Sequence, residues 1–93
     1  MKYVIISRHP AAIEFIRATD ARFAEAPVIT GNATPDDVRG HIVAGNIPLN
    51  LAALAEEVVA VEFSGAPPRG AEYGATEMAA AGARLAKYIV RGA

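Results

Sequence analysis

The side chains best suited to chemistry in this sequence stand together near its start, as Ser7-Arg8-His9. Arginine carries a fixed positive charge on a planar fork of donors that matches a phosphate or a carboxylate. Histidine gains or loses a proton near neutral pH, and a serine hydroxyl can donate to a phosphate oxygen. Because these three side chains lie between an apolar run and a predicted helix start, they indicate a candidate anion-binding site.

The same triplet also has an ordinary structural interpretation, which the sequence alone leaves open. Arg8 can pair with Glu14 or with a carbonyl at a helix end, and His9 can cap the helix that follows it. Ser7 can be a simple turn residue. The functional interpretation gains support from position, because residues that follow a strand in an α/β sheet often bind ligands.

A second group of polar side chains lies in the segment Gly-Asn-Ile-Pro-Leu-Asn at residues 45–50. An amide in the first turn of a helix can orient a hydroxyl or a phosphate, so Asn50 is a candidate ligand-binding residue, and Asn46 and Pro48 stand in the same segment. Both asparagines can instead hydrogen-bond to nearby backbone. Tyr73, in a glycine-flanked segment, can stack on a base or pack against the prolines at 67–68.

The elements that must position these residues are predicted from the hydrophobic pattern and the helix signals. Short apolar, β-branched runs are typical of strands covered on both faces. Helices are indicated by proline at the first position, by capping residues and by apolar spacing of three and four. The predicted strands are 3–6, 28–30, 41–44 and 58–63; the predicted helices are 10–18, a turn from 34 that Gly40 ends, 49–57 and 76–90. Arg84, Lys87 and Arg91 then fall on one face of the last helix.

Strands that alternate with helices predict an α/β fold with a mostly parallel sheet of about four strands and helices on both sides. The simplest right-handed winding gives the strand order 2-1-3-4. The chain direction then reverses between the first and third strands, and ligands bind beyond the carboxyl ends of strands at such a point. Both polar groups are expected in that crevice, within a single domain spanning residues 1–93.

Composition excludes several classes of function. Nine basic residues against ten acidic ones give a net charge of -1, so we expect no binding to long nucleic acid. There is no cysteine, which fits a cytoplasmic protein without disulfides, and the distant His9 and His41 do not indicate a metal site. No phosphate-binding glycine loop is present, so no nucleotide cofactor is expected. The N-terminal apolar run is too short for a signal peptide and too short to span a membrane.

Three segments together resemble a known family. They are Ser7-Arg8-His9-Pro10-Ala11-Ala12-Ile13-Glu14-Phe15, Gly45-Asn46-Ile47-Pro48-Leu49-Asn50-Leu51-Ala52-Ala53 and Gly82-Ala83-Arg84-Leu85. They resemble the Csx family numbered sixteen, small CRISPR-associated proteins of type III systems. Ala11 stands where that family usually has glycine, and Asn46 where it usually has threonine. A further motif is reduced here to Glu72 and Thr76.

The resemblance implies a Rossmann-like fold of the CARF type and a homodimer that binds a cyclic oligoadenylate, most often cyclic tetra-adenylate. It also implies a metal-independent ring nuclease, in which a ribose 2'-hydroxyl attacks the adjacent phosphorus and leaves a 2',3'-cyclic phosphate. Arg8 would stabilise the developing charge, and His9 would be a general acid or base. Ser7, Asn46, Pro48, Asn50 and Tyr73 would contact the ligand. Destroying this messenger would switch off an antiviral response.

Two other functions share the same residues. A protein that binds the cyclic messenger without cutting it would act as a sponge, and its site would differ from a catalytic one only in alignment. A strand followed by Arg-His also resembles the opening of histidine phosphatases, in which the histidine is phosphorylated. That family normally has glycine after the histidine, whereas this chain has Pro10, and the chain lacks the family's second basic cluster.

Overall fold

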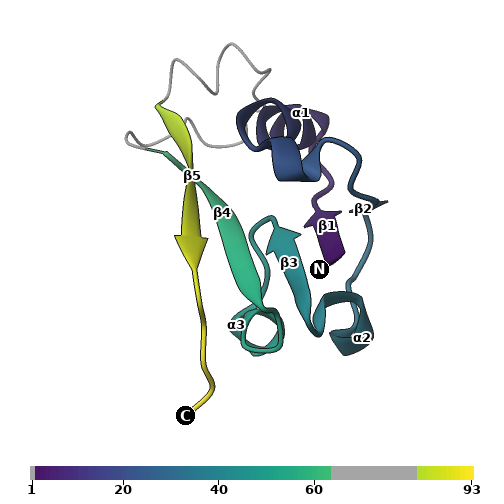
Figure 1. Ribbon diagram of the computed structural model, residues 1–93, viewed down its shortest axis with the longest axis vertical. Helices are drawn as coiled ribbons and strands as arrows, with labels where there is room; N and C mark the ends of the chain where they lie inside the picture. The colour runs from purple at the N-terminus through teal and green to yellow at the C-terminus, as the bar shows by residue number, and fades with distance from the viewer. Residues whose placement is uncertain (1, 64–81) are drawn as a thin grey trace.

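The computed structural model describes residues 2–63 and 82–93, which build one five-stranded sheet in the order β2-β1-β3-β4-β5 (Figure 1). Strands β1 to β4 run parallel to one another, and β5 is antiparallel to β4. The strands are Lys2–Ile6 (β1), Val28–Ile29 (β2), His41–Ala44 (β3), Glu57–Phe63 (β4) and Ala83–Tyr88 (β5). The helices are Pro10–Thr19 (α1), the 3-10 turn Ala21–Phe23 (η1), Pro35–Val38 (α2) and Leu49–Ala52 (α3).

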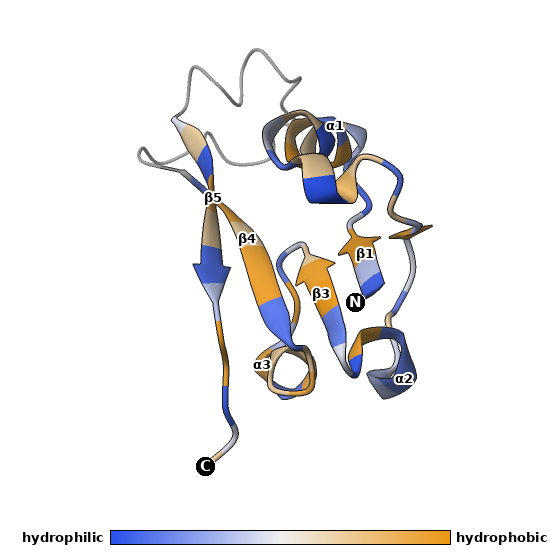
Figure 2. Ribbon diagram, viewed as in Figure 1, coloured by the Kyte–Doolittle hydropathy of each residue, from blue (hydrophilic) through white to orange (hydrophobic). Residues whose placement is uncertain are grey.

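The sheet separates two apolar clusters, because consecutive residues of a strand point to opposite faces. Val4 belongs to the cluster that Leu51 of α3 covers, whereas Ile5 belongs to the cluster that Ile16 of α1 and Phe23 of η1 cover. The strands β1, β3 and β4 are hydrophobic along most of their length (Figure 2). Their continuous apolar runs are therefore explained by burial on both sides of the sheet.

Local signals in the sequence placed the starts of α1, α2 and α3 correctly. Pro10 occupies the first position of α1, where its missing N–H costs nothing. At α2 the carboxylate of Asp37 accepts hydrogen bonds from the backbone N–H of Thr34 at 2.7 Å and from the Thr34 hydroxyl at 3.0 Å. These bonds lower the pKa of Asp37. Gly40, with φ +72°, ends this turn as predicted.

Helix α3 is shorter than the predicted span 49–57, because it ends at Ala52. Two further hydrogen bonds, from the Leu54 and Ala55 N–H groups, continue the turn. The N–H of Glu56 then donates to the carbonyl of His41 at 2.8 Å. The backbone at residue 56 therefore already pairs with β3, and this sheet hydrogen bond replaces the helical one that the apolar spacing predicted.

The prediction of a helix at 76–90 is wrong where the structure describes that segment. Residues 83–88 form β5, which pairs with β4 from Phe63↔Ala83 to Val58↔Tyr88. An unpaired edge on β4 leaves a row of backbone donors and acceptors, and β5 satisfies them. In a strand, Arg84 and Lys87 point to opposite faces of the sheet, so they do not share the single face expected of a helix.

The fold is α/β with a mixed, mostly parallel sheet. The predicted order of the first four strands is confirmed, and the sheet has five strands rather than about four. The chain passes from β1 to β2 in one direction and from β3 to β4 in the other. The point of reversal lies between β1 and β3, as the sequence predicted.

Candidate functional site

The carboxyl ends of β1 and β3 lie side by side, and Gly45 is the residue that lets them approach. Ile5 pairs with Ala44, so Ile6, the last residue of β1, is level with Gly45, the first residue after β3. A Cβ on Gly45 would come within 2.1 Å of the Ile6 carbonyl oxygen, and Gly45 has φ +134°. Only glycine fits this position without displacing backbone. The two polar segments therefore start from adjacent positions at one edge of the sheet.

Ser7, Arg8 and His9 form the turn between β1 and α1. The N–H of Ser7 donates to the carbonyl of Ile29, which ties the turn to β2. The Ser7 hydroxyl oxygen accepts the N–H of His9 at 3.2 Å, so Ser7 also has the turn role that the sequence left open. Arg8 is exposed, and its Nη2 donates to Oδ1 of Asn32 at 3.4 Å.

His9 is exposed at the cap position of α1, with extended backbone angles. Pro10 follows it, and the first turn of the helix contains no acidic side chain. The backbone N–H groups at the start of a helix have no intrahelical acceptor, and the helix dipole makes that end positive. The Arg8 guanidinium and this helix end are therefore two sources of positive potential within one short turn.

The second polar segment follows β3. Asn46 is exposed, but both polar atoms of its amide are engaged by the backbone of Val61 in β4. Pro48 is exposed just before α3, and Asn50 is exposed within that short helix. Tyr73 lies outside the described residues. Of the predicted ligand-binding residues, Pro48 and Asn50 thus have solvent-facing side chains, and Asn46 has a structural partner.

Sequence reasoning missed Asn32. A lone asparagine after Gly31 is typical of a turn, and nothing in its spacing links it to Arg8, 24 residues away. Only the pairing of β1 with β2 brings the loop after β2 to the same edge of the sheet. Among the described residues, the loops after β1, β2 and β3 therefore meet at this edge of the sheet.

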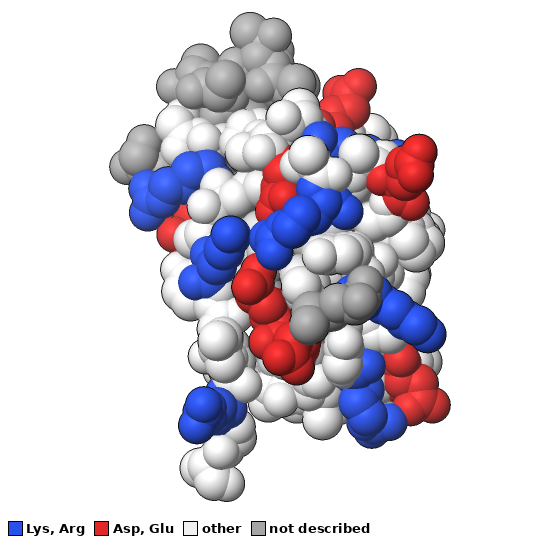
Figure 3. All heavy atoms as spheres, viewed as in Figure 1, with Lys and Arg blue, Asp and Glu red and all other residues white. Residues whose placement is uncertain are grey.

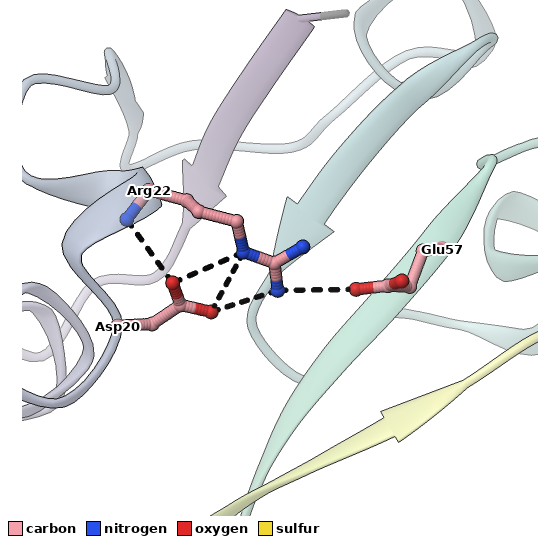
Figure 4. Close-up of polar contacts among 3 residues, drawn as sticks. All are labelled: Asp20, Arg22 and Glu57. Carbon is pink, nitrogen blue, oxygen red and sulfur yellow. Dashed lines mark hydrogen bonds and ion pairs between the residues drawn. The ribbon is translucent and has the colours of Figure 1, made fainter.

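Sequence reasoning also missed an ion-pair cluster that braces α1 and η1 against β4 (Figure 4). Arg22 donates to Asp20 at 2.8 Å and to Glu57 at 3.2 Å, and its guanidinium lies 5.9 Å from the centre of the Tyr3 ring. The hydrogen bond from Arg22 is the largest cause of the lowered pKa of Asp20, and the pKa of Arg22 is raised in turn. Glu57 begins β4, so this cluster stands at the opposite end of the sheet from the candidate site.

Basic and acidic side chains are interspersed on the face drawn in Figure 3. The described part of this face therefore shows no continuous stripe of one charge (Figure 3). Within residues 2–63 and 82–93, no three histidine or carboxylate side chains gather as metal ligands. The helices of this same part of the chain are all too short or too polar to cross a bilayer.

The fold and the site define an α/β protein with a candidate anion-binding edge at the reversal point of its sheet. A model of a family of CRISPR-associated proteins, described as Cas_VVA1548, matches residues 4–91. Because the match spans almost the whole chain, the protein belongs to this family of CRISPR-associated proteins. No curated protein and no solved structure matches the chain.

Proposed function

We propose that this CRISPR-associated protein is a ring nuclease of the Csx family numbered sixteen, with a Rossmann-like fold of the CARF type. Its substrate is a cyclic oligoadenylate, with cyclic tetra-adenylate as the first candidate. The observation that carries the proposal is the exposed guanidinium of Arg8 at the reversal point of the sheet, next to His9 and the positive end of α1. Family membership supports the CRISPR context.

The reaction is an internal transfer at phosphorus that needs no added nucleophile. The 2'-oxygen of one ribose attacks the adjacent phosphorus and loses its proton, while the 5'-oxygen of the next nucleotide leaves and gains a proton. The products are a 2',3'-cyclic phosphate and a free 5'-hydroxyl. The protein therefore has to align the 2'-oxygen with the leaving oxygen and stabilise negative charge on the phosphorane.

Arg8 carries the second of these tasks. Its guanidinium is exposed and hydrogen-bonded to the neutral amide of Asn32, and no carboxylate among residues 2–63 and 82–93 pairs with it to cancel its charge. His9 transfers a proton to or from the reacting oxygens, a role typically worth ~10²–10⁴-fold in rate. Ser7 keeps its hydroxyl proton for a phosphate oxygen, and Asn50 orients a ribose.

A second copy of the chain completes the site. A ring of four identical nucleotides has two-fold symmetry, and a dimer with a two-fold axis presents two equivalent edges to it. This arrangement also explains how a protein with a net charge of -1 holds a polyanion, because only the shared pocket has to be positive.

The test is cleavage of labelled cyclic tetra-adenylate in the presence of a chelator, with product separation. Arg8→Ala should slow cleavage by ~10²–10³-fold, the usual cost of losing one donor to developing charge. Arg39→Ala is the matched control, because Arg39 is an exposed arginine whose ion-pair partner is Asp36 on α2. Its rate should equal that of the wild type.

The same assay distinguishes a nuclease from a sponge. Tight binding of cyclic tetra-adenylate without any loss of the intact ring would refute catalysis and favour sequestration. If Arg8→Ala and Arg39→Ala lowered the rate equally, the placement of the site at the carboxyl edge would be wrong.

A further inference from the structure

The backbone pairing between β3 and β4 stops before β4 ends. The last paired residues are Ala44 and Val59, and the N–H of Gly45 adds one more bond to the Val59 carbonyl at 2.9 Å. Strand β4 nevertheless continues to Phe63, roughly 13 Å past Val59 at the usual rise per residue. On the β3 side, this extension therefore has to find hydrogen-bond partners that are not part of a strand.

The side chain of Asn46 supplies those partners. Its Oδ1 accepts the N–H of Val61 at 3.2 Å, and its Nδ2 donates to the Val61 carbonyl at 3.4 Å. A primary amide offers the same donor and acceptor as a peptide group. Asn46 therefore replaces one rung of the parallel ladder, after the backbone of β3 has turned away.

Val61 connects this rung to the candidate site. Its side chain packs against the same buried cluster as Ile13, in the first turn of α1. On its other side, the loop that Asn46 holds begins at Gly45, whose backbone touches the Ile6 carbonyl. The turn that carries Arg8 and His9 runs from Ile6 to α1. It therefore starts at the residue that Gly45 approaches, and it leads into the helix whose Ile13 packs against the same cluster as Val61.

We infer that Asn46 is a positioning residue, which sets the alignment of Arg8 and His9 by bracing the β3 exit loop to β4. Its amide is occupied by Val61 and does not contact the ligand, in contrast to the ligand-binding role predicted from the sequence. This inference rests on the proposed function where it concerns catalysis. The brace itself can be measured without any ligand.

The first test is amide hydrogen exchange, followed by NMR on the ligand-free chain. Asn46→Ala should speed exchange at the Val61 N–H and shift the amide resonances of Arg8 and His9. Asn46→Asp keeps an oxygen to accept from the Val61 N–H but loses the donor to the Val61 carbonyl, so it should retain only part of the Val61 protection. Asn50→Ala, a matched change in an exposed amide, should leave all three signals unchanged. Undisturbed Val61 exchange or unmoved Arg8 and His9 resonances in Asn46→Ala would overturn the inference.

The second test separates rate from affinity with cyclic tetra-adenylate. Asn46→Ala should lower the single-turnover rate at saturating ligand by ~10–100-fold, the scale of a small misalignment, and leave Kd within about threefold. Asn50→Ala should raise Kd instead. A rise in Kd equal to the fall in rate would mean that Asn46 grips the ligand, which contradicts the inference. If the wild type cleaves no ring, the proposed function fails, and the exchange measurements alone decide the brace.

Discussion

Replacing Gly45 by alanine should destabilise the protein severely, because two independent penalties coincide there. The new Cβ would lie 2.1 Å from the Ile6 carbonyl oxygen and 3.1 Å from its carbon. These are backbone atoms of a central strand, so they cannot swing aside as a flexible side chain would. In addition, φ at Gly45 is +134°, which costs a residue with a Cβ ~1–3 kcal/mol by itself.

The steric clash and the positive φ together should lower the free energy of unfolding by about 4–5 kcal/mol, which is larger than the effect of most single substitutions. Gly40→Ala is the matched control, because Gly40 also has a positive φ, but a Cβ added to it would meet no atom within 4 Å. Its cost should be only the conformational one, ~1–2 kcal/mol. For a chain of this size each kcal/mol lowers Tm by about 4–8 °C.

Urea and thermal unfolding, followed by circular dichroism, compare the two variants directly. A Gly45→Ala protein that unfolds at the same urea concentration as Gly40→Ala would refute the reasoning. It would mean that β1 and β3 do not approach as closely at Ile6, and that the two loops of the candidate site are not held together at this point. Gly31→Ala, which has neither a positive φ nor a close contact, serves as the baseline.

Three further predictions test the rest of the structure. Asp20→Asn should lower the free energy of unfolding by ~1–3 kcal/mol at neutral pH, because it weakens a charged hydrogen bond to Arg22. The pKa of Asp20 is lowered in the folded state, so this stability is present above the ordinary value of 3.8 and is lost as the pH falls through the folded pKa. The unfolding curves of wild type and variant should therefore converge in acid. Leu85→Ala should lower the free energy of unfolding by ~1–2 kcal/mol, because Leu85 on β5 is half-buried against the core. Arg84→Ala should lower it by less than ~1 kcal/mol in the same urea titration, because its ion pair with Glu62 is exposed. Equal losses for the two variants would contradict the assignment of residues 83–88 as a strand. His9→Ala should slow cleavage of cyclic tetra-adenylate more than it weakens binding, and equal losses in both would reduce His9 to a ligand contact.

Most of the strand order could be predicted from the sequence, because its signals are local or follow from chain geometry. The run of β-branched residues at 3–6 is typical of a strand buried on both faces, and strands joined by helices wind with one hand. Pro10, the Thr34–Asp37 pair and Gly40 mark helix ends through bonds within a few residues. These observations sufficed to place Ser7, Arg8 and His9 beside the segment after β3.

The tertiary structure decided what the local pattern leaves ambiguous. The apolar spacing of residues 83–88 fits a helix as well as a strand. These residues form a strand because they pair with the backbone groups along the edge of β4. Asn32 contacts Arg8 because β1 pairs with β2. Asn46 contacts Val61 because β4 extends beyond the end of β3. Both of these contacts join residues that are distant in the chain. The amino acid types set which bonds an amide or a guanidinium can make, and the packing of the sheet selects which of those bonds form.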